Sequence, residues 1–255
     1  MSRVMMTAVL FTSVALTAAC GGAKSGSDAA SDSGKPAQAS ASAAASAADS
    51  AFAGKTALQI WAESVKAAKA AKSVHVTANI KADSDTIKVD LRLSDSSKGS
   101  GSLTVNGGKA EIIQSGKAIY FKGDDKFWSN LDATAGKSFA NKWIKSSADD
   151  PKFGSFLVFT DMDQFTQGSL TLDSAAEKKN LKRVAGKTIN GQPTVGLEDS
   201  GPGLATDKSG TLYVAATGPA LPLELRPAED KDEFITFDEW NEPVTVKVPQ
   251  NAHTL

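Results

Sequence analysis

The feature that most constrains the fold of this 255-residue chain is a period-two alternation of apolar and polar residues. Because successive side chains of a strand point to opposite faces, each alternating run predicts a strand with one apolar face. Asn106-Gly107 between two of the runs is typical of a tight hairpin turn. The first part of the chain therefore predicts a five-stranded antiparallel meander, with strands in 74–81, 87–93, 103–105, 110–112 and 119–121.

Alternation stops between about Asp124 and Lys179 and returns near Leu181. The last of the returning runs is strict, since Val244, Val246 and Val248 are separated by Thr and Lys. This second block predicts six more strands, in 181–188, 193–198, 211–217, 222–226, 233–238 and 244–248.

Helices are predicted before and between the two blocks of strands. Lys55 to Lys72 places apolar residues three and four apart, which predicts a helix whose apolar stripe is Leu58, Trp61, Val65 and Ala68. The stretch without alternation is rich in aromatic residues and predicts short helices in 151–156 and 161–167. Their candidate N-caps are Asp149, Asp150 and Asp161.

These elements predict an α+β fold, in which a curved antiparallel half-barrel of about eleven strands has helices covering its concave face. So few covering elements leave two alternatives, a core packed by the aromatic side chains or an apolar cavity that binds apolar ligands. We favour the cavity. Its lining candidates are Val89, Leu91, Ile119, Phe121, Trp128, Trp143, Phe156, Phe159, Phe165, Leu212 and Val214.

The N-terminus has the layout of a secretory signal: Arg3, an apolar run from Val4 to Leu16, and small residues before Cys20. The apolar run is shorter than the ~20 residues that a permanent membrane span needs. The sequence LTAACGG around Cys20 resembles a bacterial lipobox, although Thr17 stands where leucine is commonest. The resemblance implies cleavage of a signal peptide at 1–19 and lipidation of Cys20, the single cysteine of the chain. The alternative is an ordinary signal with a chance cysteine.

Residues 20–51 are mostly Ala, Ser, Gly and Asp, and they include no bulky apolar side chain. This composition predicts a flexible linker rather than part of a core, with a transient helix in 39–48 as the alternative. We therefore divide the chain into a signal peptide (1–19), the lipidated cysteine with its linker (20–51), and one folded domain (52–255).

The order of these elements resembles the LppX/LprG family of actinobacterial lipoproteins, which has a LolA-like fold. The resemblance covers Phe52 to Val248 and includes the stretches GGKAEIIQSGKAIYFKGDDKFW, NKWIK, GTLYVAATGPALPLELRP and ITFDEWNEPVTVKVP. It implies a half-barrel with helices on its concave side. It also implies that the protein holds the acyl chains of a lipid or glycolipid inside the half-barrel and moves this lipid away from the cytoplasmic membrane. The family has no fixed motif of binding side chains, so the resemblance assigns no ligand residues.

Composition argues against several other classes of protein. The formal net charge is −1, which gives no bias toward nucleic acid. One cysteine and two distant histidines argue against a zinc site and against most Ser-His or Cys-His catalysis. We expect His75 to be solvated on a polar strand face and His253 to lie in a frayed tail. The carboxylate pairs at 124–125 and 161–163 are explained more simply by helix caps than by catalysis or calcium binding, so we expect no enzyme, metal or cofactor.

The leading hypothesis is thus a lipid-anchored envelope lipoprotein on the extracytoplasmic side of the cell membrane. Its expected partners are acyl chains and the cytoplasmic membrane, with a membrane transporter as a further candidate. The alternative is a protein-binding envelope sensor or regulator with the same half-barrel. A basic cluster is either a solvated strand start or a contact for anionic head groups near the mouth of the cavity; it consists of Lys178, Lys179, Lys182 and Arg183.

Overall fold

The computed structural model describes residues 51–82, 85–131, 138–150, 159–172, 174–199 and 209–254. The chain divides into two compact units, 1–34 and 35–255, and all described residues belong to the second. The predicted signal peptide, Cys20, the linker up to residue 50, and the predicted helix at 151–156 lie outside the described residues.

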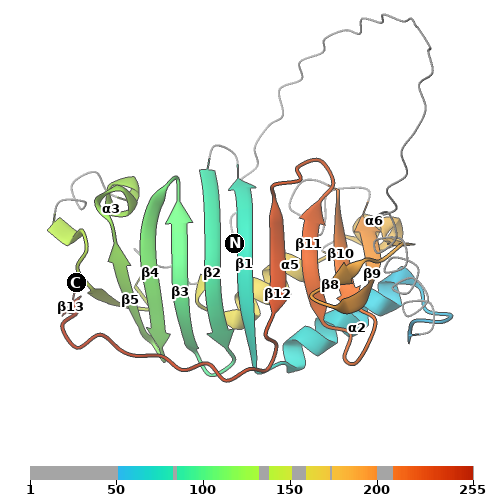
Figure 1. Cartoon of the computed structure of the whole chain (residues 1–255), viewed down its shortest axis with the longest axis horizontal. Coiled ribbons are helices and arrows are strands. Elements are labelled where there is room, and N and C mark those ends of the chain that lie inside the picture. Colours follow the sequence, from blue (N-terminus) through green and yellow to red (C-terminus); the bar gives the residue numbers. More distant parts are fainter. Residues whose placement is uncertain are drawn as a thin grey trace, which may run out of the picture. The chain divides into compact units, whose positions relative to one another are not determined.

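Thirteen strands within the described residues form the main part of the fold. Their spatial order is β13-β6-β5-β4-β3-β2-β1-β12-β11-β10-β9-β7, with β8 paired to β9 (Figure 1). The first five strands follow one another through short turns and pair antiparallel as predicted. Their bounds are β1 Ser73–Ala82, β2 Asp85–Ser94, β3 Lys98–Val105, β4 Gly108–Ser115 and β5 Ala118–Gly123.

The strands that follow the helical segment, β7 to β12, form the second half of the sheet, which we call the return half. They differ in detail from the prediction. The run expected at 181–188 is split into two short strands that both pair with β9. Asn190 and Gly191 both have positive φ, as a two-residue hairpin turn between β8 and β9 requires. The bounds are β7 Lys182–Val184, β8 Thr188–Ile189, β9 Gln192–Asp199, β10 Gly210–Ala215, β11 Pro222–Pro227 and β12 Phe234–Asp238.

The strand predicted at 244–248 is wrong. These residues join no β-ladder with any strand of the described residues. Figure 1 shows the chain after β12 running along the lower ends of the meander strands, across their direction, where it cannot extend a ladder. It ends in β13, His253–Thr254, which pairs parallel with β6, Ile144–Ser147. The prediction missed both short strands, and His253 is held in a strand rather than frayed.

Four helices are described: α2 Ala57–Ala70, α3 Asp125–Leu131, α5 Met162–Leu170 and α6 Ala175–Asn180. Thr56 and Gln59 form a capping box at the start of α2. Asp161 caps α5 as predicted, and Asp124 accepts a hydrogen bond from the Phe127 backbone at the start of α3. The predicted stripe of α2 is shifted. The side chains buried against the sheet are Ala57, Ile60, Ser64 and Ala68, whereas Leu58 is 38% exposed.

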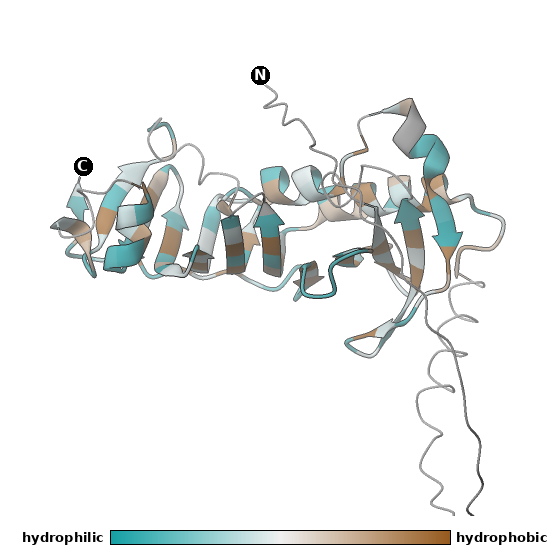
Figure 2. Cartoon of the chain, turned by 90° about the horizontal axis from the view of Figure 1, so that it is seen from above, coloured by the Kyte–Doolittle hydropathy of each residue, from teal (hydrophilic) through white to brown (hydrophobic). Residues whose placement is uncertain are grey.

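We call the sheet face that carries the apolar side chains the inner face, and the opposite face the outer face. Figures 1 and 2 show α2 and α5 lying along the inner face. The inner face buries two apolar clusters. Cluster 1 lies on β1–β6 with α3 and the start of α5, and cluster 2 lies on β9–β11 with α2 and the end of α5. The α+β fold with a curved, mainly antiparallel sheet is therefore confirmed, with thirteen strands rather than about eleven.

Candidate functional site

Most of the predicted cavity-lining residues do lie on the inner face, but they divide between the two clusters. Cluster 1 contains Val89, Leu91, Ile119, Phe121, Trp128 and Phe165, with Phe159 packed against it. Cluster 2 contains Leu212 and Val214. The candidates in the two clusters are buried to at least 95% of their surface, so they face other side chains rather than solvent.

Two candidates are not part of this group. Trp143 is only partly buried, and its ring lies 5.9 Å from the ammonium of Lys122. Lys122 alternates with Ile119 and Phe121 of cluster 1, so this pair belongs to the outer side of β5. Phe156 lies outside the described residues.

An apolar groove between α2 and α5 was not predicted. It has a volume of about 150 Å³. Trp61 in α2 donates from its indole nitrogen to the carbonyl of Leu170, at 3.0 Å, and so joins the two helices. Residues 61 and 170 are far apart in sequence, and only the apolar spacing of α2 hinted at such a surface. The groove is lined by Trp61, Val65, Lys69, Gln167, Leu170, Thr171 and Leu172.

The predicted basic cluster lies at the end of α6 and the start of β7. Lys178, Lys179 and Lys182 are exposed. Arg183 is partly buried and donates to the carbonyl of Phe52 at 3.0 Å. Arg183 therefore anchors the start of the folded domain, which is a structural role that the sequence did not indicate.

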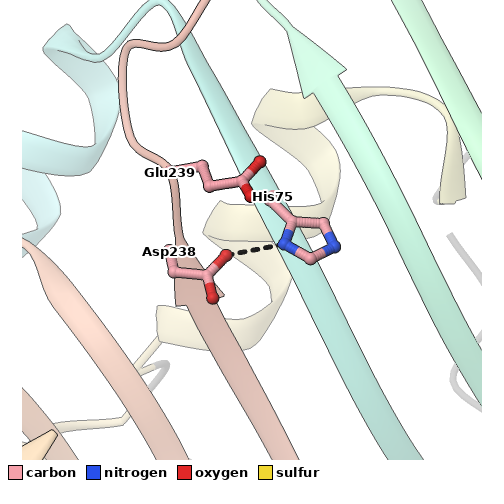
Figure 3. A group of neighbouring side chains, drawn as sticks. All are labelled: His75, Asp238 and Glu239. Atoms are coloured by element: carbon pink, nitrogen blue, oxygen red, sulfur yellow. Dashed lines mark hydrogen bonds and ion pairs between the residues drawn. The ribbon is translucent and has the colours of Figure 1, made fainter. Parts of the chain in front are cut away.

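His75 belongs to a cross-strand charge network on the outer face, contrary to the prediction that it is solvated (Figure 3). Its side chain is 12% exposed; Nδ1 lies 2.6 Å from Asp238 and Nε2 lies 3.0 Å from Asp90. Arg92 bonds both carboxylate oxygens of Glu239, which raises the pKa of Arg92 and lowers the pKa of Glu239. His75, Asp238 and Glu239 bring ligand-type atoms within 4.8 Å of one another, but Arg92 occupies both oxygens of Glu239. The network therefore joins β1, β2 and the end of β12 through the contacts of His75 with two carboxylates and through the Arg92–Glu239 ion pair.

A second charged cluster on the outer face lies in the return half. The Glu224 carboxylate is 8% exposed and accepts from Lys187 at 2.8 Å and from Arg226 at 2.6 Å. Burial alone would raise the pKa of Glu224, but these two hydrogen bonds outweigh it and hold the pKa below its usual value. Lys187 also lies 4.2 Å from the ring centre of Tyr213, whose pKa is raised by burial. The cluster is buried because the β8–β9 hairpin lies over the outer side of β10 and β11 (Figure 1).

The comparisons with known proteins identify the fold. No family model and no curated protein matches the sequence. The crystal structure of LprF from Mycobacterium bovis, a lipoprotein of the LppX/LprG family, matches at 18% identity with a TM-score of 0.50. The match covers 76% of this chain and 96% of LprF.

Two structures of MucB also match, with TM-scores too low for an inference. MucB in complex with MucA(peri) has 14% identity and a TM-score of 0.36 over 78% of this chain and 61% of MucB. The MucA/MucB complex of Pseudomonas aeruginosa gives 13% identity and a TM-score of 0.31 over 73% and 56%. This chain thus spans about three fifths of MucB. Among the described residues, no helix is both long and apolar enough to cross a membrane. The likeness to LprF confirms the resemblance seen in the sequence at the level of the fold: this chain has a fold similar to that of LprF.

Proposed function

We propose that this protein is a membrane-anchored envelope lipoprotein that binds the acyl chains of a lipid or glycolipid on its inner face. The observation that carries the proposal is the apolar inner face, which in the described part of the chain is covered by short helices with an apolar groove between α2 and α5. A chain in this groove would lie against Trp61, Val65 and Leu172 and beside cluster 2.

Acyl chains fit this surface chemically. Each methylene removed from water contributes about 0.8 kcal/mol, so a chain of ordinary length binds tightly with few polar contacts. A protein of this kind needs no catalytic group, and we propose no enzymatic activity. The protein-binding alternative predicts instead that no acyl chain binds to the purified protein.

Anchoring completes the proposal. Lipid on Cys20 would hold the protein at the extracytoplasmic side of the cell membrane, and two or three acyl chains anchor stably where one alone is marginal. A linker of ~30 residues reaches about 30 Å root-mean-square, so the folded domain would sample the surface of its own membrane. It would take lipid there and carry it away, with a membrane transporter as a candidate partner. If Cys20→Ala leaves fractionation and detergent partitioning unchanged, the anchoring part is wrong.

Filling the groove tests the acyl-binding part. Val65→Trp adds a large side chain to a partly exposed wall of the groove, so it should abolish binding of a fluorescent fatty-acyl probe while leaving the melting temperature nearly unchanged. Val89→Trp in cluster 1 and Val214→Trp in cluster 2 test whether the bound acyl chain also reaches either cluster. Where the cluster is fully packed, the substitution should lower the free energy of unfolding by about 1–3 kcal/mol through overpacking. Where it lines the cavity, binding should be lost without this cost.

The outcomes separate the hypotheses. Probe binding that survives all three substitutions, or a wild-type protein that binds no acyl probe, contradicts the proposal and favours the protein-binding alternative. Val248→Trp is the matched control, because Val248 is 37% exposed outside the inner face and its substitution should change neither quantity.

A further inference from the structure

An open groove lies on the outer face where β1 ends and β12 begins. Figure 1 shows these two strand ends side by side. We call it the rim groove; its volume is about 550 Å³. The strand register places Lys88, Asn79 and Phe234 side by side across β2, β1 and β12. Arg226 reaches this row from β11 and lies 5.7 Å from the ring centre of Phe234. The groove is lined by Asn79, Lys81, Thr86, Lys88, Arg226, Lys231, Asp232 and Phe234.

The rim groove carries more positive than negative charge. Lys81 pairs with Asp230 at 2.6 Å, and Arg226 pairs with Glu224 at 2.6 Å. Lys88 and Lys231 are exposed and form no ion pair with another described residue. Asp232 is the acidic side chain in the lining, so the two unpaired lysines leave a local excess of positive charge.

An apolar notch of about 40 Å³ adjoins this groove and shares Asn79, Lys81 and Phe234 with it. Its other walls include Ile80, Leu225 and Ile235, whose side chains belong to or pack against the inner-face clusters. Pro227 and the buried Glu233 complete the lining, and the Glu233 carboxylate accepts a hydrogen bond from the Lys81 backbone at 2.8 Å. The notch lies where β11 and β12 are joined through only two residue pairs, Glu224–Thr236 and Leu225–Ile235. Its volume is only a few times the ~10–15 Å³ that a cavity needs to hold one water, so it admits only a short apolar segment.

We propose that the rim groove and notch together bind an anionic amphiphile. A phosphate or carboxylate head group would lie against Lys88 and Lys231, and the adjoining apolar segment would enter the notch toward Ile80 and Ile235. This inference rests on the proposed function and adds the charge of the head group and its position. It differs from the sequence prediction, which placed anionic head groups at Lys178, Lys179, Lys182 and Arg183. The notch supplies an apolar wall beside the lysines, which is the reason for choosing the rim groove.

The experiment uses the full-length protein and two lipids of equal chain length, lysophosphatidylglycerol (anionic) and lysophosphatidylcholine (zwitterionic), with inorganic phosphate as a third ligand. Wild type should prefer the anionic lipid and should bind free phosphate weakly, because phosphate gains nothing from the notch. Each basic side chain contributes about fivefold to binding of an anionic head group, so Lys88→Gln with Lys231→Gln should reduce the preference about 25-fold. Asp232→Asn should raise it about fivefold.

Two double variants serve as controls. Lys98→Gln with Lys145→Gln makes the same change of net charge at exposed strand positions outside the groove, and should leave the preference unchanged. Lys178→Gln with Lys179→Gln tests the competing cluster. The inference is overturned if the preference is unchanged in the rim variant, if it falls equally in the control, or if it falls only in the 178/179 variant. If wild type binds neither lipid, the proposed function itself fails, whereas binding of both lipids without preference contradicts only the head-group inference.

Discussion

The two halves of the sheet differ in how far their outer face is covered. In the meander half the outer face is open to solvent apart from the half-buried His75, and an ion pair such as Lys122 with Glu111 is exposed. In the return half the outer face is partly covered by the β8–β9 hairpin, and Glu224 is buried between two cations. The alternation of apolar and polar residues looks alike in both halves. The difference shows that alternation identifies which face is apolar but not whether the polar face reaches solvent.

The largest expected effect comes from truncating the core of each half. Leu91→Ala in cluster 1 and Leu212→Ala in cluster 2 should each lower the free energy of unfolding by about 2–5 kcal/mol. Because the two residues lie in different clusters, the double variant should cost the sum of the single costs within about 0.5 kcal/mol. Denaturant unfolding measures all three. A strongly non-additive double variant would mean that the two clusters form one core.

A smaller effect distinguishes the two outer faces. Glu224→Gln leaves Lys187 and Arg226 without their carboxylate and should cost about 1–3 kcal/mol. Glu111→Gln, the matched change in the meander half, breaks an exposed pair and should cost less than about 1 kcal/mol. Equal costs in chemical unfolding would contradict the claim that the hairpin buries the outer face of the return half.

The acid dependence of stability should follow the same difference. The pKa of Glu224 is lower in the folded protein than its ordinary value of 4.5. Its ionised form therefore stabilises the fold above that value, and this contribution is lost as the pH falls through the folded pKa. Unfolding of wild type and Glu224→Gln between pH 7 and 2 should show a shallower acid loss in the variant. Parallel curves would mean that Glu224 does not titrate as the structure implies.

The smallest expected effect is a gain. Ser64 of α2 is buried against cluster 2, and its hydroxyl has no hydrogen-bond partner among the described residues. Ser64→Ala should raise the free energy of unfolding by about 1 kcal/mol, because it removes an unpaired polar group and improves helix propensity. Ser169→Ala is the control, since its hydroxyl donates to the Phe165 carbonyl at 2.8 Å and should give no such gain. A loss of stability in Ser64→Ala would mean that the hydroxyl has a favourable contact.

The meander was predictable from sequence because its contacts are local. Alternating runs are joined by short turns such as Asn106-Gly107, and each strand pairs with the next. The β8–β9 hairpin has a similar signal in Asn190-Gly191, which was not among the predicted turns. Strands as short as β6 and β13 have too few residues to show a period. Residues 244–248 alternate strictly and yet pair with none of the described strands, because their chain direction crosses the sheet.

The candidate site was harder to predict for a related reason. Alternation correctly placed residues such as Val89 and Leu212 on the inner face, but not in two separate clusters. The α2–α5 groove depends on a contact between Trp61 and Leu170, and the rim groove depends on the register of β12 against β1. Both pair segments that are distant in sequence, and no local pattern specifies which of them meet.

Native mass spectrometry of the full-length protein, purified from its own membrane without added lipid, tests the central claim most directly. If the inner face binds acyl chains, the spectrum should contain a population heavier by the mass of a lipid or glycolipid in addition to any lipid on Cys20. Solvent extraction should remove this mass, and the Val65→Trp variant should lack it. A spectrum that shows only lipid-free protein, or extra mass that persists unchanged in Val65→Trp, Val89→Trp and Val214→Trp, would contradict acyl-chain binding on the inner face.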